Sequence, residues 1–156
     1  MNKTSKEYER ISSLLKKVQR ERFPELNSEI ILLEERTFSS EKDDGTGLTS
    51  ISAMGIIDNE ISYRARITKY LPDDAMDGAI GHELAHAFLG HNSEGIEKYM
   101  KDKEYKDVVE RAADEETKKR GLEKELELFY VLEDIWWKKL EVTKKDIKAA
   151  RRKIYT

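Results

Sequence analysis

The chain of 156 residues contains no cysteine, which excludes disulfide bonds and metal sites built from thiolates. Proline occurs twice and glycine eight times, while 29 Lys and Arg stand beside 32 Asp and Glu. Such a composition is typical of a helix-rich protein with a charged surface. No apolar run approaches the roughly 20 residues of a membrane-spanning helix, and the polar N-terminus lacks the apolar core of a signal peptide. We therefore expect a cytoplasmic protein that does not enter membranes.

Histidine is also scarce, with three residues that all lie between positions 82 and 91. Two of them, His82 and His86, occur with Glu83 in the pattern H-E-x-x-H, which on a helix presents both imidazoles to one zinc ion. Residues four apart in a helix point in directions about 40° apart, so the two rings can share a metal. Glu83 is rotated by about 100° from His82 and would stand beside the ion, where it can accept a proton from water.

A helix from residue 73 to residue 90 is expected around this motif. Pro72 and the acidic residues after it favour a helix start, and Gly90 favours the end. The side of this helix opposite the histidines is apolar, which predicts that it faces the core. This side comprises Met76, Ile80, Leu84, Ala87 and Phe88.

A zinc site needs a third protein ligand, with the fourth position left to water where the site is catalytic. His91 lies about 140° from His86 on a continuing helix, which is more typical of a C-terminal helix residue favoured by the macrodipole. Glu110 is the stronger candidate, since Asp114 follows it one helical turn later and could accept the free ring N–H of a ligand histidine. Either His91 or Glu110 would complete a site of imidazole and carboxylate. The buried face of the helix around Glu110 is expected to comprise Tyr105, Val108 and Ala112.

The two motifs, H-E-x-x-H and E-x-x-x-D, together resemble those of the gluzincins, the thermolysin-like zinc peptidases. The short chain is similar to the minigluzincins of the abylysin and jannalysin type. The resemblance covers residues 1 to about 120 and implies an α+β fold with an N-terminal backing helix and a small, mainly antiparallel three-stranded sheet. An active-site helix, a glutamate helix and a helical C-terminal extension would follow. It implies that Zn²⁺ is bound by His82, His86 and Glu110, with Glu83 as general base and Asp114 supporting a ligand histidine.

The resemblance further implies a zinc metalloendopeptidase that hydrolyses a peptide or protein substrate and is latent through its C-terminal segment. Gluzincins often place a histidine or a tyrosine after the glutamate helix to stabilise the tetrahedral intermediate, and Tyr130 and Tyr155 are the candidates here. Two alternatives stay open. One is a catalytically silent or regulatory zinc-binding module, and the other is a DNA-associated protease resembling SprT-type domains, which also begin from H-E-x-x-H.

Residues 1–121 are expected to form a minimal zincin-like metallopeptidase domain, and residues 122–156 a helical extension that packs on it. Periodicity predicts a helix over residues 3–22 and strands over residues 29–36, 49–57 and 60–68, with a polar loop over 41–47 and a turn at 58–59. The strand over 60–68 alternates apolar and polar residues, as a half-exposed outer strand does. Its open edge could pair with an extended substrate peptide.

The C-terminal extension carries an apolar stripe, which is expected to pack on the domain. The stripe comprises Leu122, Leu126, Phe129, Trp136 and Leu140. Two alternatives stay open for this segment. It could cover the active-site cleft, or it could form contacts between copies in a homo-oligomer. Residues 138–156 hold eight Lys or Arg against two acids, and such a basic tail could touch nucleic acid. No aromatic stacking pattern accompanies it, so nucleic-acid binding is not expected.

Overall fold

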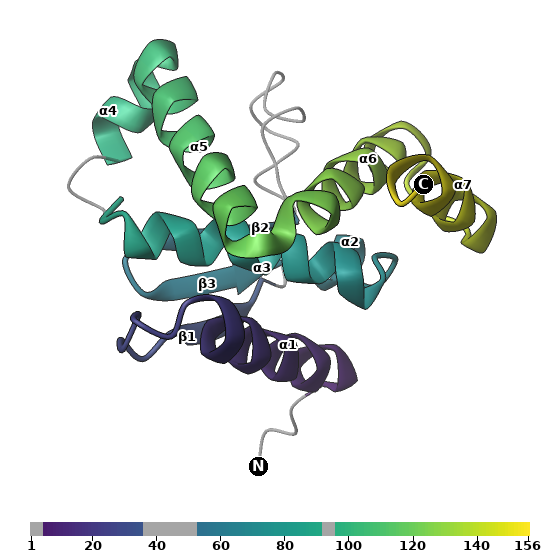
Figure 1. Cartoon of the computed structure of the whole chain (residues 1–156), viewed down its shortest axis with the longest axis horizontal. Helices are drawn as coiled ribbons and strands as arrows, with labels where there is room; N and C mark the ends of the chain where they lie inside the picture. Colours follow the sequence, from purple (N-terminus) through teal and green to yellow (C-terminus); the bar gives the residue numbers. More distant parts are fainter. Residues whose placement is uncertain (1–4, 36–52, 92–95) are drawn as a thin grey trace.

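The structure, a computed structural model, describes residues 5–35, 53–91 and 96–156. It has the predicted α+β fold, with a small sheet among many helices (Figure 1). The elements, in chain order, are α1 (Lys6–Arg22), β1 (Ile31–Glu34), β2 (Met54–Ile57), β3 (Glu60–Tyr63), α2 (Ala65–Thr68), α3 (Asp73–Phe88), α4 (Ile96–Lys101), α5 (Lys103–Thr117), the π-helical segment η4 (Lys118–Leu122), α6 (Glu123–Lys139) and α7 (Lys144–Ile154). The predicted loop over 41–47 and the first residues of the predicted strand 49–57 lie outside the described residues.

The sheet is mixed and has the order β1-β3-β2. β3 lies in the centre, parallel to β1 and antiparallel to β2, and Asp58 in the β2–β3 turn has a φ of 55°, as its turn chemistry predicts. The prediction of an outer strand over 60–68 is wrong, because β3 ends at Tyr63 and residues 65–68 form α2. Every second residue is apolar from the strand through Ile67, but Ile67 is buried as part of the helix α2. The alternation alone therefore could not show where the strand ends. Among the strands that the structure describes, β1 and β2 lie at the two edges of this sheet.

Helix α1 begins where Ser5 accepts a hydrogen bond from the Tyr8 N–H, with acidic residues in its first turn and basic residues in its last. These features match the helix dipole. Its buried side comprises Ile11, Leu14, Leu15 and Val18. Arg10 pairs with Asp73 at 2.6 Å. This pair and the apolar side fix α1 against α3.

Helix α3 runs through the middle of the molecule, with α1 on one side and α5 and α6 on the other (Figure 1). It starts after Pro72, as predicted, and the predicted apolar back is fully buried at Met76, Ile80 and Leu84. Phe88 departs from the prediction, since it is 39% exposed at the end of the helix. The polar side of α3 is also buried, because α5 and α6 cover it. The H-E-x-x-H motif therefore lies on a central helix rather than on the surface.

Helices α5 and α6 diverge from a bend at Gly121, whose φ is 90°, a value that favours glycine. The buried side of α6 comprises Leu126, Leu128, Phe129, Leu132 and Trp136. The extension thus packs on α3, although Leu140 of the predicted stripe is 53% exposed. The division of the chain at residue 121 stays a prediction.

Helix α7 closes the chain with a capping box between Thr143 and Asp146. Its Arg151 pairs with Asp74 in the first turn of α3 at 2.9 Å, which ties the C-terminus to the start of the central helix. Across the described residues, no helix combines the length and the apolar character needed to cross a bilayer.

Candidate metal centre

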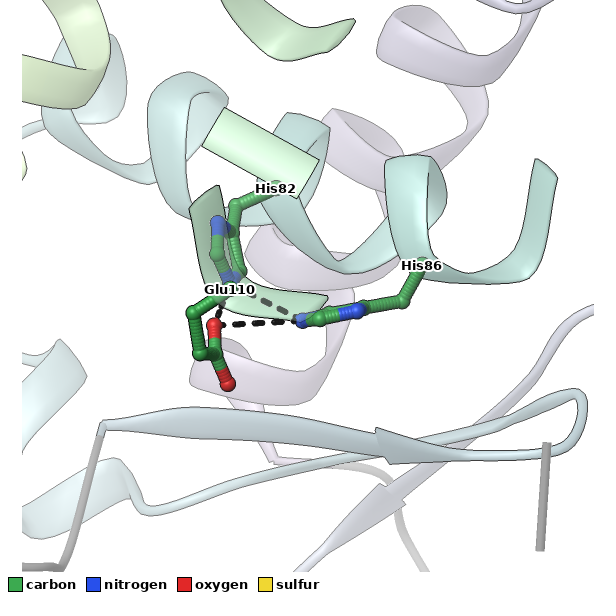
Figure 2. Close-up of side chains that lie close together, drawn as sticks. All are labelled: His82, His86 and Glu110. Atoms are coloured by element: carbon green, nitrogen blue, oxygen red, sulfur yellow. Dashed lines mark hydrogen bonds and ion pairs between the residues drawn. The ribbon is translucent and has the colours of Figure 1, made fainter. Parts of the chain in front are cut away.

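The two histidines of the central helix point their Nε2 atoms toward the same place. Because His82 and His86 lie one turn apart on α3, their Nε2 atoms are only 3.0 Å apart. Both residues are buried, at 8% and 7% exposure. Figure 2 shows the two rings projecting from successive turns toward Glu110.

Glu110 reaches this place from α5 and completes a triangle of donor atoms. Its Oε2 atom lies 2.8 Å from Nε2 of His82 and 3.3 Å from Nε2 of His86 (Figure 2). In a tetrahedral zinc site with bonds of about 2.0–2.1 Å, ligand atoms lie about 3.3–3.4 Å apart. The three distances between donor atoms, 2.8, 3.0 and 3.3 Å, are close to or slightly shorter than this spacing. The structure thus brings together three side chains that could bind a metal ion.

Asp114 determines which nitrogen of His82 faces the triangle. Its Oδ1 atom lies 2.7 Å from Nδ1 of His82 and also accepts a hydrogen bond of 2.6 Å from the hydroxyl of Tyr130. A carboxylate only accepts hydrogen bonds, so Nδ1 is the donor. The neutral ring then carries its lone pair on Nε2, as a metal ligand requires.

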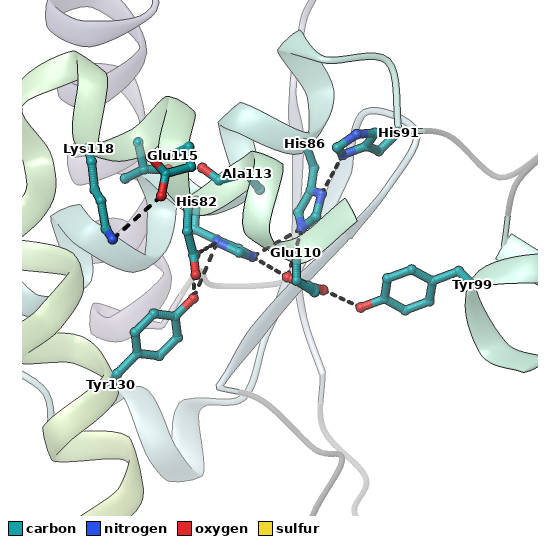
Figure 3. A network of polar contacts seen from close by, with 11 residues as sticks. His82, His86, His91, Tyr99, Glu110, Ala113, Glu115, Lys118 and Tyr130 are labelled. Atoms are coloured by element: carbon teal, nitrogen blue, oxygen red, sulfur yellow. Dashed lines mark hydrogen bonds and ion pairs between the residues drawn. The ribbon is translucent and has the colours of Figure 1, made fainter. Parts of the chain in front are cut away.

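His91 lies behind His86 rather than beside the triangle. The chain reverses at Gly90, whose φ is 75°, and the His91 N–H donates to the carbonyl of His86 at 2.9 Å. The two Nδ1 atoms are then 2.9 Å apart (Figure 3). The prediction of His91 as a residue of a continuing helix is wrong, because the left-handed turn ends that helix first. His91 contacts the nitrogen of His86 that faces away from Glu110.

Helix α5 presents Glu110 and Asp114 from the side that packs on α3. The predicted buried face of this helix is wrong, since Val108 is 60% exposed and the buried residues are Val109, Ala113 and Thr117. Periodicity had placed the apolar face opposite the acidic one. The two faces are adjacent because the same helix, α3, provides both the core contact and the histidines.

The sequence left Tyr130 and Tyr155 as alternatives and gave no prediction for Tyr99. Tyr130 of α6 reaches the site, because its hydroxyl donates to Asp114 and lies 3.5 Å from Nδ1 of His82. Tyr155 does not, since it contacts Asp74 at the opposite end of α3. Tyr99 of α4 donates its hydroxyl to Oε1 of Glu110 (Figure 3). No periodic signal pointed to Tyr99, because α4 is a short helix and its contact depends on how it packs beside α5.

The electrostatics of the site favour positive charge at His82. Burial lowers the pKa of His82, but hydrogen bonds to Asp114 and Glu110 outweigh burial and raise it to about 10. For Glu110, burial raises the pKa, yet the hydrogen bonds from His82 and His86 hold it well below its usual range. The same carboxylates would stabilise a metal cation in place of the proton on Nε2.

Glu83 is buried next to the triangle, at 8% exposure, without belonging to it. Burial raises its pKa to about 7, against the opposing effect of the charges of His82 and His86. A carboxyl group with a pKa near neutrality can both accept and return a proton. The site therefore combines three donor atoms that could bind a metal ion with a buried carboxyl group whose pKa lies near neutrality.

No family model matches the chain, and neither a curated protein nor a solved structure is significantly similar to it. The candidate metal centre therefore rests on the three donor atoms that the structure brings together. Two imidazoles and a carboxylate suit zinc, but iron and other divalent metals also use such a set. Geometry thus supports a metal site without choosing the metal.

Proposed function

We propose that the chain is a zinc-dependent metallopeptidase of the gluzincin type. The single observation that carries the proposal is the convergence of Glu110 Oε2 on the Nε2 atoms of His82 and His86, at 2.8 and 3.3 Å. Two histidines and one glutamate are the ligands of catalytic zinc in thermolysin-like enzymes, with the fourth position left open. The absence of cysteine is consistent with a catalytic rather than a structural zinc site.

When bound, zinc would polarise the scissile carbonyl and lower the pKa of the attacking water. Glu83 accepts the proton from that water and returns it to the leaving nitrogen, a role that a pKa of about 7 suits well. Asp114 keeps the proton of His82 on Nδ1 throughout, so Nε2 stays directed at the metal.

Tyr130 is the candidate that donates a hydrogen bond to the tetrahedral intermediate, and Tyr155 is not. Burial and the hydrogen bond to Asp114 raise the pKa of Tyr130, so its hydroxyl remains a donor at neutral pH. A donor beside the ligand histidines is suited to stabilising developing negative charge. The Tyr130 hydroxyl would then have to divide its hydrogen bond between Asp114 and the intermediate, or leave Asp114.

In this proposal an extended substrate peptide pairs with the edge of the sheet at β2. The sequence had predicted this pairing for residues 60–68. β2 forms an edge of the sheet and contacts α3, the helix that carries the histidines. An extended peptide that pairs with such an edge would be held beside the site.

Glu83→Gln is the test of the assigned chemistry. The purified parent should carry about one zinc per chain and cleave an unstructured protein such as casein, whereas the variant should keep the zinc and lose cleavage. The matched control is Glu127→Gln, which removes an exposed carboxylate from α6 and should change neither property. A Glu83→Gln protein that cleaves like the parent would show that Glu83 is not the base.

A catalytically silent zinc-binding module is the second candidate, and burial favours it. His82, Glu83 and His86 are all at most 8% exposed beneath α5 and α6. A parent protein that binds zinc and cleaves no peptide would support this candidate. Removing residues 122–156 is a poor test of latency, because Leu128 and Leu132 of α6 are fully buried and their loss would unfold the core.

A further inference from the structure

The two oxygens of Glu110 have different partners. Oε2 faces the imidazole nitrogens, while Oε1 accepts the hydrogen bond from the hydroxyl of Tyr99 (Figure 3). An ionised carboxylate only accepts hydrogen bonds, so the phenol of Tyr99 is the donor. One oxygen of the carboxylate is therefore engaged away from the triangle.

We propose that Tyr99 is a positioning residue that restricts Glu110 to coordination through one oxygen. A carboxylate can bind a cation through one or both oxygens, and the hydrogen bond from Tyr99 stabilises the form in which Oε1 stays off the metal. Binding through both oxygens would fill the position that a catalytic zinc site leaves open. The inference rests on the metal centre proposed above and adds a residue that controls its coordination number.

The position of Tyr99 is set by the same helix that carries Glu110. The Asp102 side chain caps the first turn of α5. The backbone N–H of the same residue donates to the carbonyl of Lys98, which joins α4 tightly to α5. Lys106, one turn before Glu110, places its ammonium group 5.4 Å from the centre of the Tyr99 ring, within the range of a cation–π contact. Because Lys106 and Glu110 lie one turn apart, both contact Tyr99 from one side of α5.

Tyr130 provides an internal comparison. It makes the same kind of hydrogen bond as Tyr99, but to Asp114, which lies behind His82 and does not face the triangle. Figure 3 shows the two phenols approaching the site from opposite sides. Loss of either hydroxyl removes one hydrogen bond near the metal, whereas only loss of the Tyr99 hydroxyl frees an oxygen of Glu110.

Cobalt(II) added to the full-length apoprotein tests the inference, because four-coordinate cobalt absorbs visible light more strongly than five-coordinate cobalt. The parent should give the intense, four-coordinate spectrum. Tyr99→Phe should give a weaker spectrum and bind cobalt about 10- to 100-fold less tightly, the usual cost of losing a partner of a metal ligand. Tyr130→Phe should lower affinity while keeping the intense spectrum. Tyr105→Phe, which changes a phenol of α5 with no hydrogen bond to the site, should match the parent.

A Tyr99→Phe protein with the spectrum and affinity of the parent would overturn the role of Tyr99 and leave the metal centre intact. A Tyr130→Phe spectrum that weakens as much as that of Tyr99→Phe would also overturn it, since the effect would then not be specific to Glu110. Failure of the parent itself to bind cobalt would overturn the metal centre and this inference together. The two failures are thus distinguishable.

Discussion

Replacing Gly78 with alanine should destabilise the protein, although alanine is the better helix former. A Cβ atom at Gly78 would lie 2.4 Å from the backbone carbon of Glu125 and the backbone nitrogen of Leu126. Ordinary contact would require α6 to move away from α3 by about 1 Å, since carbon atoms pack at about 3.5–4.0 Å. The clash is with backbone, so no rotamer change can relieve it.

The expected magnitude combines two opposing effects. Overpacking of this kind costs about 1–3 kcal/mol and occasionally more, and the backbone clash favours the upper end. The change from glycine to alanine returns about 1 kcal/mol of helix propensity. We therefore expect a net loss of about 2 kcal/mol in the free energy of unfolding, or a fall in Tm of about 4–8 °C for a chain of this size.

Gly81→Ala is the matched control on the same helix. Its new Cβ would lie 2.6 Å from Cδ1 of Leu122 and 3.2 Å from Cγ2 of Thr117, which are ends of side chains. Leu122 can change rotamer, so the net effect should stay within about 1 kcal/mol of zero. Urea unfolding of the parent and both variants, compared at unchanged m-value, gives the two differences. A Gly78→Ala protein as stable as the parent would refute the close approach of α3 and α6.

Two further predictions concern the metal centre. Asp114→Ala removes the partner of Nδ1 of His82 and should weaken zinc binding about 10- to 100-fold, as measured by competition with a chromophoric chelator; an unchanged affinity would contradict its assigned contact. Because hydrogen bonds to carboxylates raise the pKa of His82 to about 10 despite burial, a proton occupies the metal-facing nitrogen at neutral pH. Zinc affinity should therefore increase as the pH rises toward this value. If titrations give the same zinc affinity from acid to alkaline pH, the proton and the zinc ion do not compete for this nitrogen.

The structure corrects the sequence-based predictions mainly at places where two helices or strands pack on one another. The order of the strands places β3 between β1 and β2, which alternation along one strand cannot reveal. The buried face of α5 follows from its contact with α3 and is centred on Val109 and Ala113 rather than Val108. His91 moves behind His86 because of a left-handed turn at Gly90. In the first two cases the missing information was a contact between segments, and in the third it was the direction in which the chain leaves the turn at Gly90.

The amino-acid sequence by itself determined that His82 and His86 share one side of a helix, because the helical repeat places residues four apart in nearly the same direction. It likewise determined the start of that helix at Pro72 and its apolar back, which depend on local backbone chemistry and burial. Only the tertiary structure decided that Glu110 closes the triangle, that Asp114 and Tyr130 meet behind His82, and that Tyr99 engages the second oxygen of Glu110. These contacts join segments far apart in the chain, and their distances depend on how closely α5 and α6 approach α3, which no periodic pattern within one helix encodes.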